Sequence, residues 1–326
     1  MTIAVYGATG YTGRLVLAEL ARRDFDTVLV GRDLDRLAAT GHRAVRHATL
    51  DHKTQLVEAF RDCELVINCV APFIRHGLPV VRAAVAAGAH YLDISGEQTY
   101  IKSVFDAFAE DAGVTIVPMV NDGGFLADLL VGMLAGPSTK DVVVAHQFTG
   151  GALSRGSART ALANAEMFTS GGLTYTDGKW QNGIPLRHPE LVFPGDDEPT
   201  HVVRFPLPEI ATIPRHVPTA HVEGVAGEGQ FAALTALTPD MLGNLPTQAP
   251  AERTGRFELL AEVDGKRGVI EGADTYGTTA IVVAEAAQRL LSTGAKPGVL
   301  APAQAFDPVT ILDSLAAYGV TLRIEH

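Results

Sequence analysis

Residues 2–20 decide the fold, and they read Thr-Ile-Ala-Val-Tyr-Gly-Ala-Thr-Gly-Tyr-Thr-Gly-Arg-Leu-Val-Leu-Ala-Glu-Leu. An apolar β run is followed by glycines at positions 7, 10 and 13, and then by a helical pattern. Glycines at these positions let the backbone turn sharply and approach a phosphate, which the helix N-terminus then helps to bind. The alternative is a plain βα turn. The stretch predicts a dinucleotide site formed by Gly7, Thr9, Gly10, Tyr11, Thr12 and Gly13.

Composition narrows the class of protein. The 326 residues are 47% hydrophobic and 19% charged, which predicts a large core and more than one lobe. A net charge of -11 without a Lys/Arg cluster excludes nucleic acid as a partner. Two cysteines, Cys63 and Cys69, provide no disulfide framework and indicate a reducing compartment. Because the nucleotide strand begins at residue 2 and no apolar run is long enough for a membrane span, we predict a cytoplasmic protein.

Apolar β runs then alternate with helical stretches through the first part of the chain. This alternation is typical of a Rossmann-type α/β fold, a doubly wound parallel sheet with helices on both faces. A ligand binds such a sheet at the carboxyl ends of its strands. The predicted strands are residues 3–6, 27–30, 44–48, 65–70, 90–94 and 114–120.

After residue 141 the alternation of strands and helices gives way to strand and hairpin patterns. Residues 142–148 read as a strand, and Asp177-Gly178 and Asp264-Gly265 are hairpin signals between β-like flanks. The clearest hairpin joins residues 256–263 to 266–270. We therefore predict an inserted α+β domain with a mainly antiparallel sheet. A proline-rich loop at 185–218, a helix at 278–291 and a final strand at 320–324 complete the reading.

The end of the second strand bears on the choice of cofactor. An acid at this position binds the ribose hydroxyls of NADH, whereas a small residue followed by arginine admits the 2′-phosphate of NADPH. Gly31 and Arg32 stand here, and Asp33 is better explained as a helix N-cap. Asp51 is a candidate for binding the adenine, and the alternative is that it is a solvated loop aspartate. The pattern favours NADP(H), with NAD(H) as the alternative.

Further motifs resemble a known family. With the glycine turn, three segments are similar to the saccharopine dehydrogenase-like oxidoreductases, a group that includes enoyl reductases acting in trans: Asn-Cys-Val-Ala-Pro-Phe at 68–73, Tyr-Leu-Asp-Ile-Ser-Gly-Glu at 91–97 and Gly-Ala-Asp-Thr-Tyr-Gly-Thr-Thr-Ala at 272–280. Residues 205–221 and 298–305 are also similar to the enoyl reductase branch. One loop departs from the pattern. Residues 121–128 lack the serines and proline that relatives carry, so substrate contacts there are not transferred and saccharopine itself is disfavoured.

The resemblance implies a division of the chain and a set of nicotinamide neighbours. It implies a dinucleotide-binding domain at 1–125, a substrate and dimerisation domain at 126–272, and a C-terminal helix and strand at 273–326 that return to the first domain. It also implies that the nicotinamide lies near Ala71, Pro72, Phe73, Gly96 and Glu97.

Hydride transfer also needs an acid at the other end of the reduced bond. The candidates are Tyr100, Asp122, Arg215, His216 and Tyr276. A packed tyrosine with a bonded hydroxyl is the alternative for Tyr276, and a solvated pair is the alternative for Arg215 and His216. Tyr175 and Lys179 have the spacing of the short-chain dehydrogenase pair, but the Asp-Gly turn between them places them on facing strands. No histidine pair has metal-ligand spacing with a carboxylate.

The sequence thus predicts an NADPH-dependent oxidoreductase that reduces a C=N or C=C bond of a small to medium metabolite. Two alternatives stay open, a short-chain-type ketone reductase and a non-catalytic dinucleotide sensor. We also predict a homodimer joined through the second lobe, because the apolar residues at 256–263 would otherwise face solvent.

Overall fold

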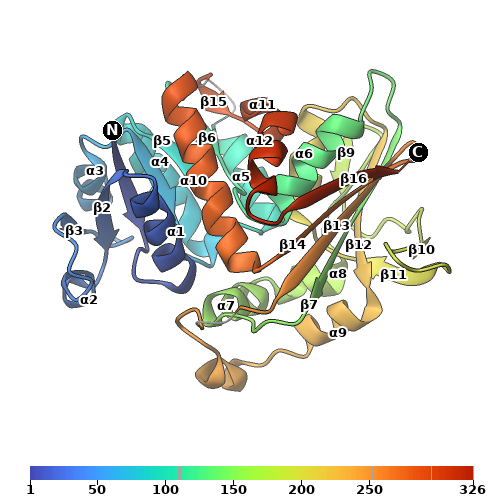
Figure 1. The fold of residues 1–326 in the computed structure, drawn as a ribbon, viewed down its shortest axis with the longest axis horizontal. Helices are drawn as coiled ribbons and strands as arrows, with labels where there is room; N and C mark the ends of the chain where they lie inside the picture. The colour runs from blue at the N-terminus through green and yellow to red at the C-terminus, as the bar shows by residue number, and fades with distance from the viewer. Residues whose placement is uncertain (109–111, 251–252, 295, 326) are drawn as a thin grey trace.

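The computed structural model describes residues 1–108, 112–250, 253–294 and 296–325. Two β sheets lie side by side, with helices packed around and between them (Figure 1). The predicted fold class, a parallel Rossmann-like sheet followed by a second and mainly antiparallel sheet, is confirmed.

The first sheet has seven parallel strands in the order β15-β6-β5-β4-β1-β2-β3. The chain builds outward from β1 in one direction and then returns to add β4 on its other side. This reversal places the ligand crevice at the carboxyl ends of β1 and β4. The strands are β1 Thr2–Tyr6, β2 Asp26–Gly31, β3 Val45–His47, β4 Leu65–Asn68, β5 His90–Asp93, β6 Thr115–Val117 and β15 Gly298–Val299.

Helices cover both faces of this sheet, which is why its strands read as continuous apolar runs. Ile3 and Val5 pack into one core, while Ala4 and Tyr6 point into the core on the other face. On the first face, α10 runs alongside α1, and Arg23 forms an ion pair with Glu285 at 2.7 Å. The helices are α1 Tyr11–Arg22, α2 Leu34–Ala38, α3 Lys53–Phe60, α4 Phe73–Ala87, α5 Gln98–Ala107, α6 Gly124–Leu134 and α10 Thr275–Thr293.

The second sheet has nine strands, and its main path is β10-β11-β12-β7-β13-β14-β16. Both predicted hairpins are present, with Asp177 and Asp264 at positive φ in the two Asp-Gly turns. Only the β7–β12 pair of this sheet is parallel among the described strands. The strands are β7 Asp141–Thr149, β8 Thr174–Thr176, β9 Lys179–Gln181, β10 Glu190–Leu191, β11 Thr200–Arg204, β12 His221–Gly227, β13 Arg256–Val263, β14 Lys266–Ala273 and β16 Thr321–Glu325.

Both faces of β13 are buried within the chain itself. Leu259 and Ala261 belong to the core that includes α6, while Leu260 packs with Leu191 and Phe193 from the proline-rich loop. The reason given above for a dimer, an open apolar face at 256–263, is therefore wrong. The loop at 185–218 covers this face.

The C-terminal part divides between the two sheets. The helix α10 and strand β15 return to the first lobe, as expected. The final strand does not, since β16 pairs antiparallel with β14 at the edge of the second sheet. That part of the prediction for 273–326 is wrong, and the domain boundaries otherwise stay a prediction. The other helices are α7 Arg155–Ala163, α8 Ala165–Ser170, η1 Pro208–Ala211, η2 Ile213–Arg215, α9 Glu228–Thr235, η3 Pro239–Asn244, α11 Pro302–Ala305 and α12 Pro308–Ala316.

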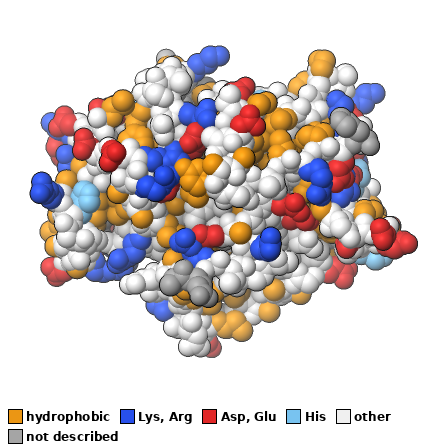
Figure 2. Space-filling model, viewed as in Figure 1, with side chains coloured by type: hydrophobic (Ala, Val, Ile, Leu, Met, Phe, Trp, Pro, Cys, Tyr) orange, Lys and Arg blue, Asp and Glu red, His pale blue; other side chains and the backbone are white. Residues whose placement is uncertain are grey.

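The surface carries both signs of charge. On the face shown in Figure 2, acidic and basic side chains are intermixed with apolar ones. Across the described residues, the helices are too short or too polar to cross a bilayer.

Candidate active site

The three glycines of the turn after β1 have different physical roles. Gly7 has φ +86°, and a Cβ there would lie 2.6 Å from Cγ2 of Val70. A Cβ at Gly13 would lie 2.3 Å from the carbonyl oxygen of Gly7, so this glycine lets α1 pack against the turn. Gly10 is open apart from that carbonyl, at 3.2 Å. Gly7 and Gly13 shape the turn, and Gly10 leaves its outer side clear for a phosphate.

A cleft of about 2340 Å³ runs from this turn to the second sheet. Its walls come from the ends of β1, β2, β4 and β5 on one side, and from β7, α7, α9 and the start of α10 on the other. Two of the predicted cofactor residues, Gly13 and Glu97, are not among the described residues that line it. Those that do are Gly7, Thr9, Gly10, Tyr11, Thr12, Gly31, Arg32, Asp51, Ala71, Pro72, Phe73 and Gly96.

The segment after β2 brings two arginines and one aspartate to the cleft. Arg32 lines the cleft, and Arg36 reaches back to donate a hydrogen bond to the Thr9 carbonyl at 3.3 Å. The Asp33 side chain accepts a hydrogen bond from the backbone of Arg36 at 3.0 Å, which is the predicted N-cap. The residue directly after β2 is therefore Arg32, and Asp33, which also lines the cleft, is engaged as a helix cap. The open outer side of Gly10 and these guanidinium groups fit a phosphorylated dinucleotide.

Glu97 supports the cleft from behind. Its carboxylate is 1% exposed and accepts hydrogen bonds from the backbone N–H groups of Phe73 and Ile74, at 2.5 and 2.8 Å, and from Asn164 at 3.0 Å. Burial raises the pKa of this carboxyl. The structure therefore shows Glu97 as an N-terminal cap of α4 that fixes the loop carrying Pro72, rather than as a cleft residue.

Three of the predicted acids lie outside the cleft. Tyr100 is buried and donates a hydrogen bond to Asp93 at 2.7 Å. The Arg215 guanidinium lies over the rings of Phe105 and Trp180, with centroids at 3.9 and 4.8 Å. These partners hold Tyr100 and Arg215 away from the cleft.

His216 is also held elsewhere. Its Nε2 lies 3.0 Å from the carboxylate of Asp128, a buried residue of α6. Burial lowers the pKa of the ring, but the Asp128 carboxylate more than offsets this, so the pKa of His216 is raised. The side chain of His216 is 10% exposed and does not line the cleft, so the solvated loop position is not found.

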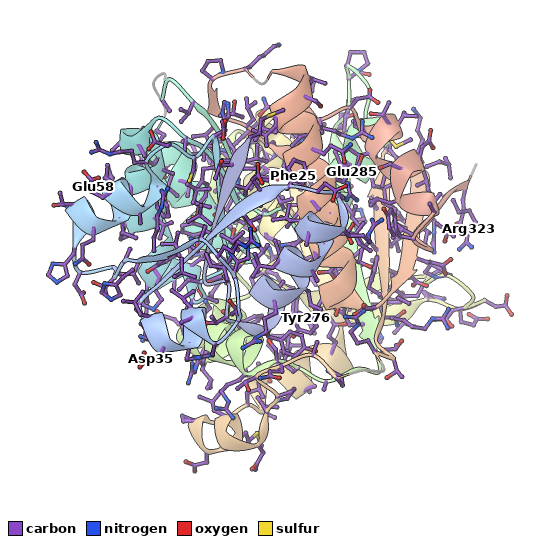
Figure 3. All side chains as sticks on the ribbon, turned by 60° about the vertical axis from the view of Figure 1, so that its left-hand side comes forward. Phe25, Asp35, Glu58, Tyr276, Glu285 and Arg323 are labelled. Atoms are coloured by element: carbon purple, nitrogen blue, oxygen red, sulfur yellow. The ribbon has the colours of Figure 1, made fainter. Side chains whose placement is uncertain are left out.

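Asp122 and Tyr276 do line the cleft. The Asp122 carboxylate accepts a hydrogen bond from the Thr279 hydroxyl at 2.7 Å, and burial raises the pKa of Asp122 to about 6. The Tyr276 hydroxyl accepts a hydrogen bond from the Ser154 backbone at 2.9 Å and lies 2.9 Å from the Ser157 hydroxyl. Figure 3 shows Tyr276 at the end of α10 that faces the second lobe.

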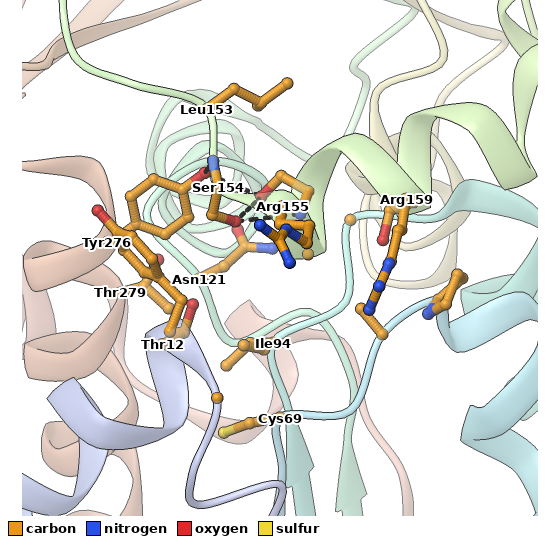
Figure 4. A pocket seen from close by; sticks show the side chains of 18 of the residues that line it. Thr12, Cys69, Ile94, Asn121, Leu153, Ser154, Arg155, Arg159, Tyr276 and Thr279 are labelled. Atoms are coloured by element: carbon orange, nitrogen blue, oxygen red, sulfur yellow. Dashed lines mark hydrogen bonds between the residues drawn. The ribbon is translucent and has the colours of Figure 1, made fainter. Parts of the chain in front are cut away.

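Sequence reasoning missed several cleft residues on the second lobe. Arg155 and Arg159 lie one turn apart on α7, and Figure 4 shows Arg159 extending toward the segment after Cys69. His146, on β7, also lines the cleft, with its Nε2 2.8 Å from the Glu209 carboxylate. No local motif identifies them, since Glu209 lies 63 residues after its partner.

The weaker motifs have structural explanations. Tyr175 and Lys179 lie on the facing strands β8 and β9, where Tyr175 packs on Trp180 at 5.2 Å, and neither lines the cleft. Cys63 and Cys69 are both free thiols. Within the described ranges, no three His, Cys, Asp or Glu residues are grouped so as to hold a metal ion.

Comparisons with known proteins find relatives of part of this chain. Residues 3–117 match the family model described as saccharopine dehydrogenase NADP binding domain. The trans-acting enoyl reductase of Mycobacterium ulcerans is 33% identical over 133 residues, which cover 35% of this chain and 31% of that protein. The human saccharopine dehydrogenase-like oxidoreductase is 26% identical over 206 residues, which cover 56% of this chain and 45% of that protein. The chain thus matches less than half the length of these curated relatives.

A solved structure shares the whole fold. Apo saccharopine dehydrogenase (L-Glu forming) from Saccharomyces cerevisiae superposes with a TM-score of 0.59 and 13% identity, and the match covers 100% of both chains. At this identity the likeness concerns the fold alone. Together, these matches confirm the predicted resemblance to saccharopine dehydrogenase-like oxidoreductases.

Proposed function

We propose that this protein is an NADPH-dependent oxidoreductase that reduces a C=N or C=C bond of a small to medium metabolite. One observation carries the proposal: a single cleft joins the dinucleotide turn at Gly10 to polar side chains of the second lobe, including Asp122 and Arg159. An enzyme needs this continuity, because the cofactor and the substrate must meet in one space.

NADPH supplies the hydride when bound. The residues of this chain bind the cofactor, orient the substrate and provide the proton. Gly10 and the N-terminus of α1 hold the pyrophosphate, and Arg32 pairs with the 2′-phosphate. Arg159 is available for an anionic group of the substrate, because it lines the cleft without a hydrogen bond or ion pair in the described part of the chain. Of the candidate proton donors predicted from the sequence, Asp122 and Tyr276 line the cleft.

The test combines binding and turnover. The purified chain is titrated with NADPH and NADH by intrinsic fluorescence, and dihydronicotinamide absorbance is then followed with an enoyl thioester, an imine and a ketone. The proposal expects tight NADPH binding and oxidation with the enoyl thioester or the imine. Turnover with the ketone alone would support the short-chain-type alternative. Binding without turnover on any of the three would support a dinucleotide sensor.

The Gly10→Val variant is the matched control for this assay. It fills the open side of the turn while leaving the second lobe unchanged, so it should lose both binding and turnover. Turnover that survives in this variant would come from a contaminant or from a site elsewhere.

A further inference from the structure

His146 and Glu209 form a buried pair at the second-lobe wall of the cleft. The side chain of His146 is 4% exposed and that of Glu209 is fully buried, and Nε2 lies 2.8 Å from Oε1. The two residues come from β7 and η1, so the pair exists only in the folded second lobe. His146 reaches the cleft, while Glu209 lies behind it.

The Glu209 carboxylate depends on this contact. Within the described residues, neither its oxygens nor Nε2 of His146 makes a hydrogen bond, and the 2.8 Å contact between the two groups is the ion pair that Glu209 has there. A carboxylate that is buried without a partner is strongly unfavourable in a protein interior. The contact with Nε2 is therefore the described interaction that can offset the burial of Glu209.

The Nδ1 edge of the ring lies next to Gly123. A Cβ at Gly123 would lie 3.3 Å from Nδ1 and 3.2 Å from Cε1 of His146, and Gly123 itself lines the cleft. The absence of a side chain at Gly123 therefore leaves this edge of the ring uncovered. Asp122 is the adjacent titratable group, and its Oδ1 is already engaged by Thr279. Phe148 closes the other side of the ring, with centroids 6.1 Å apart.

We propose that His146 donates the proton in the reduction and that Glu209 is its positioning residue. The inference rests on the proposed function. The double bond accepts the hydride at one atom, and its π electron pair moves to the other atom. That atom takes the proton from Nδ1 of His146, and loss of the hydride would leave the donor as the nicotinamidium cation of NADP⁺. Solvent then returns a proton to the ring, and the contact between Nε2 and Glu209 holds the ring in position.

The kinetic test uses the probe that the wild-type protein reduces among the enoyl thioester, imine and ketone. His146→Gln should lower kcat roughly 100-fold or more while the Kd for NADPH stays within about twofold. Glu209→Gln should lower kcat roughly tenfold and displace the high-pH limb of the rate profile, and Glu209→Asp should restore part of the loss. His188→Gln is the matched control, because it breaks another His–Glu contact, with Glu223, away from the cleft.

A second readout is independent of turnover. In ¹⁵N-histidine spectra of the NADP⁺ complex, with His146→Gln providing the assignment, Nε2 should carry its hydrogen throughout the titration and Nδ1 should gain and lose the proton. Glu209→Gln should abolish that preference. A permanent hydrogen on Nδ1, or normal turnover in a folded His146→Gln protein, would overturn the inference. A wild-type protein that reduces none of the probes would instead contradict the proposed function, and the spectra would still decide the state of the pair.

Discussion

The ring of Tyr11 packs on the ring of Tyr276, with their centroids 4.6 Å apart and the planes tilted by 55°. Tyr11 lies within the glycine turn, at the start of α1, and Tyr276 lies at the start of α10. The Tyr276 hydroxyl is bonded in turn to the segment at the start of α7. A chain of contacts therefore links the phosphate-binding turn to the helix that carries Arg155 and Arg159.

Two substitutions of Tyr276 should separate the effect of its hydroxyl on stability from the effect of its ring on NADPH binding. Tyr276→Phe keeps the ring but loses the bonds to Ser154 and Ser157, so unfolding should become easier by about 1 kcal/mol with NADPH affinity retained. Tyr276→Ala also removes the packing partner of Tyr11 and should weaken NADPH binding roughly tenfold. Thermal melts and fluorescence titrations measure the two effects. Equal affinities of the wild-type and Ala proteins would show that the ring contact does not order the turn.

The glycine turn yields a second prediction from two neighbouring positions. Gly10→Val should lower cofactor affinity by orders of magnitude in a protein that still folds, because the new side chain enters the space left for the pyrophosphate. Gly13→Val should instead reduce expression or melting temperature, since its Cβ would collide with the Gly7 carbonyl. Circular dichroism and cofactor titration distinguish the two. A folded Gly10→Val protein with normal cofactor affinity would show that the motif is a plain βα turn without a role in cofactor binding.

Cofactor preference should depend on Arg32. Because no acid follows β2 directly and Arg32 lines the cleft, NADPH should bind more tightly than NADH. Arg32→Ala should weaken NADPH by roughly tenfold to 100-fold and NADH by less than about threefold. Arg43→Ala removes an exposed arginine that does not line the cleft, and it should change neither affinity. An equal loss for both cofactors in Arg32→Ala would remove the argument for phosphate recognition.

Local signals and long-range packing explain what could be predicted from the sequence. The glycine turn, the Asp33 cap and the Asp264-Gly265 hairpin each depend on residues close in the chain, and all three are present as expected. The predicted positions of Arg215 and His216 are wrong, because a proline-flanked loop is usually exposed and these two side chains are packed against the core. Only the folded core brings Phe105 and Asp128 to them.

The same limit applies to the last strand and to the missed histidine. The alternation of residues 321–325 suits an edge strand of either sheet, so its true partner β14 could not be deduced from the strand alone. His146 sits in an ordinary apolar strand, and its significance depends on Glu209, which a separate 3₁₀ turn brings against it.

Asp122 should make stability depend on pH. Burial raises its pKa from 3.8 to about 6, so the folded protein binds this proton more tightly than the unfolded chain. The resulting stabilisation is complete below about pH 4 and is lost as the pH rises through about 6. Asp122→Asn should therefore stabilise the protein by about 1–2 kcal/mol at about pH 8 and lose that advantage at about pH 4.

Melting curves of the wild-type and Asp122→Asn proteins across this range provide the measurement. Asp313→Asn, which changes an exposed carboxylate, should give a pH-independent difference close to zero. A constant offset for Asp122→Asn would mean that the carboxyl is ionised in both states and that the cleft does not desolvate it.

The homodimer stays a prediction. Because the face of β13 is covered, we now expect the dimer interface at β16. This strand ends the second sheet, and its Leu322 and Ile324 are 37% and 36% exposed. An uncovered edge with apolar side chains favours pairing with a second copy about a twofold axis. Light scattering at micromolar concentration should give twice 34.4 kDa, and Ile324→Lys should shift the mass toward the monomer. Leu34→Lys, which alters an exposed apolar residue of the first lobe, should leave the dimer intact. A wild-type mass near 34.4 kDa, or dissociation by Leu34→Lys but not by Ile324→Lys, would contradict a dimer built on this edge.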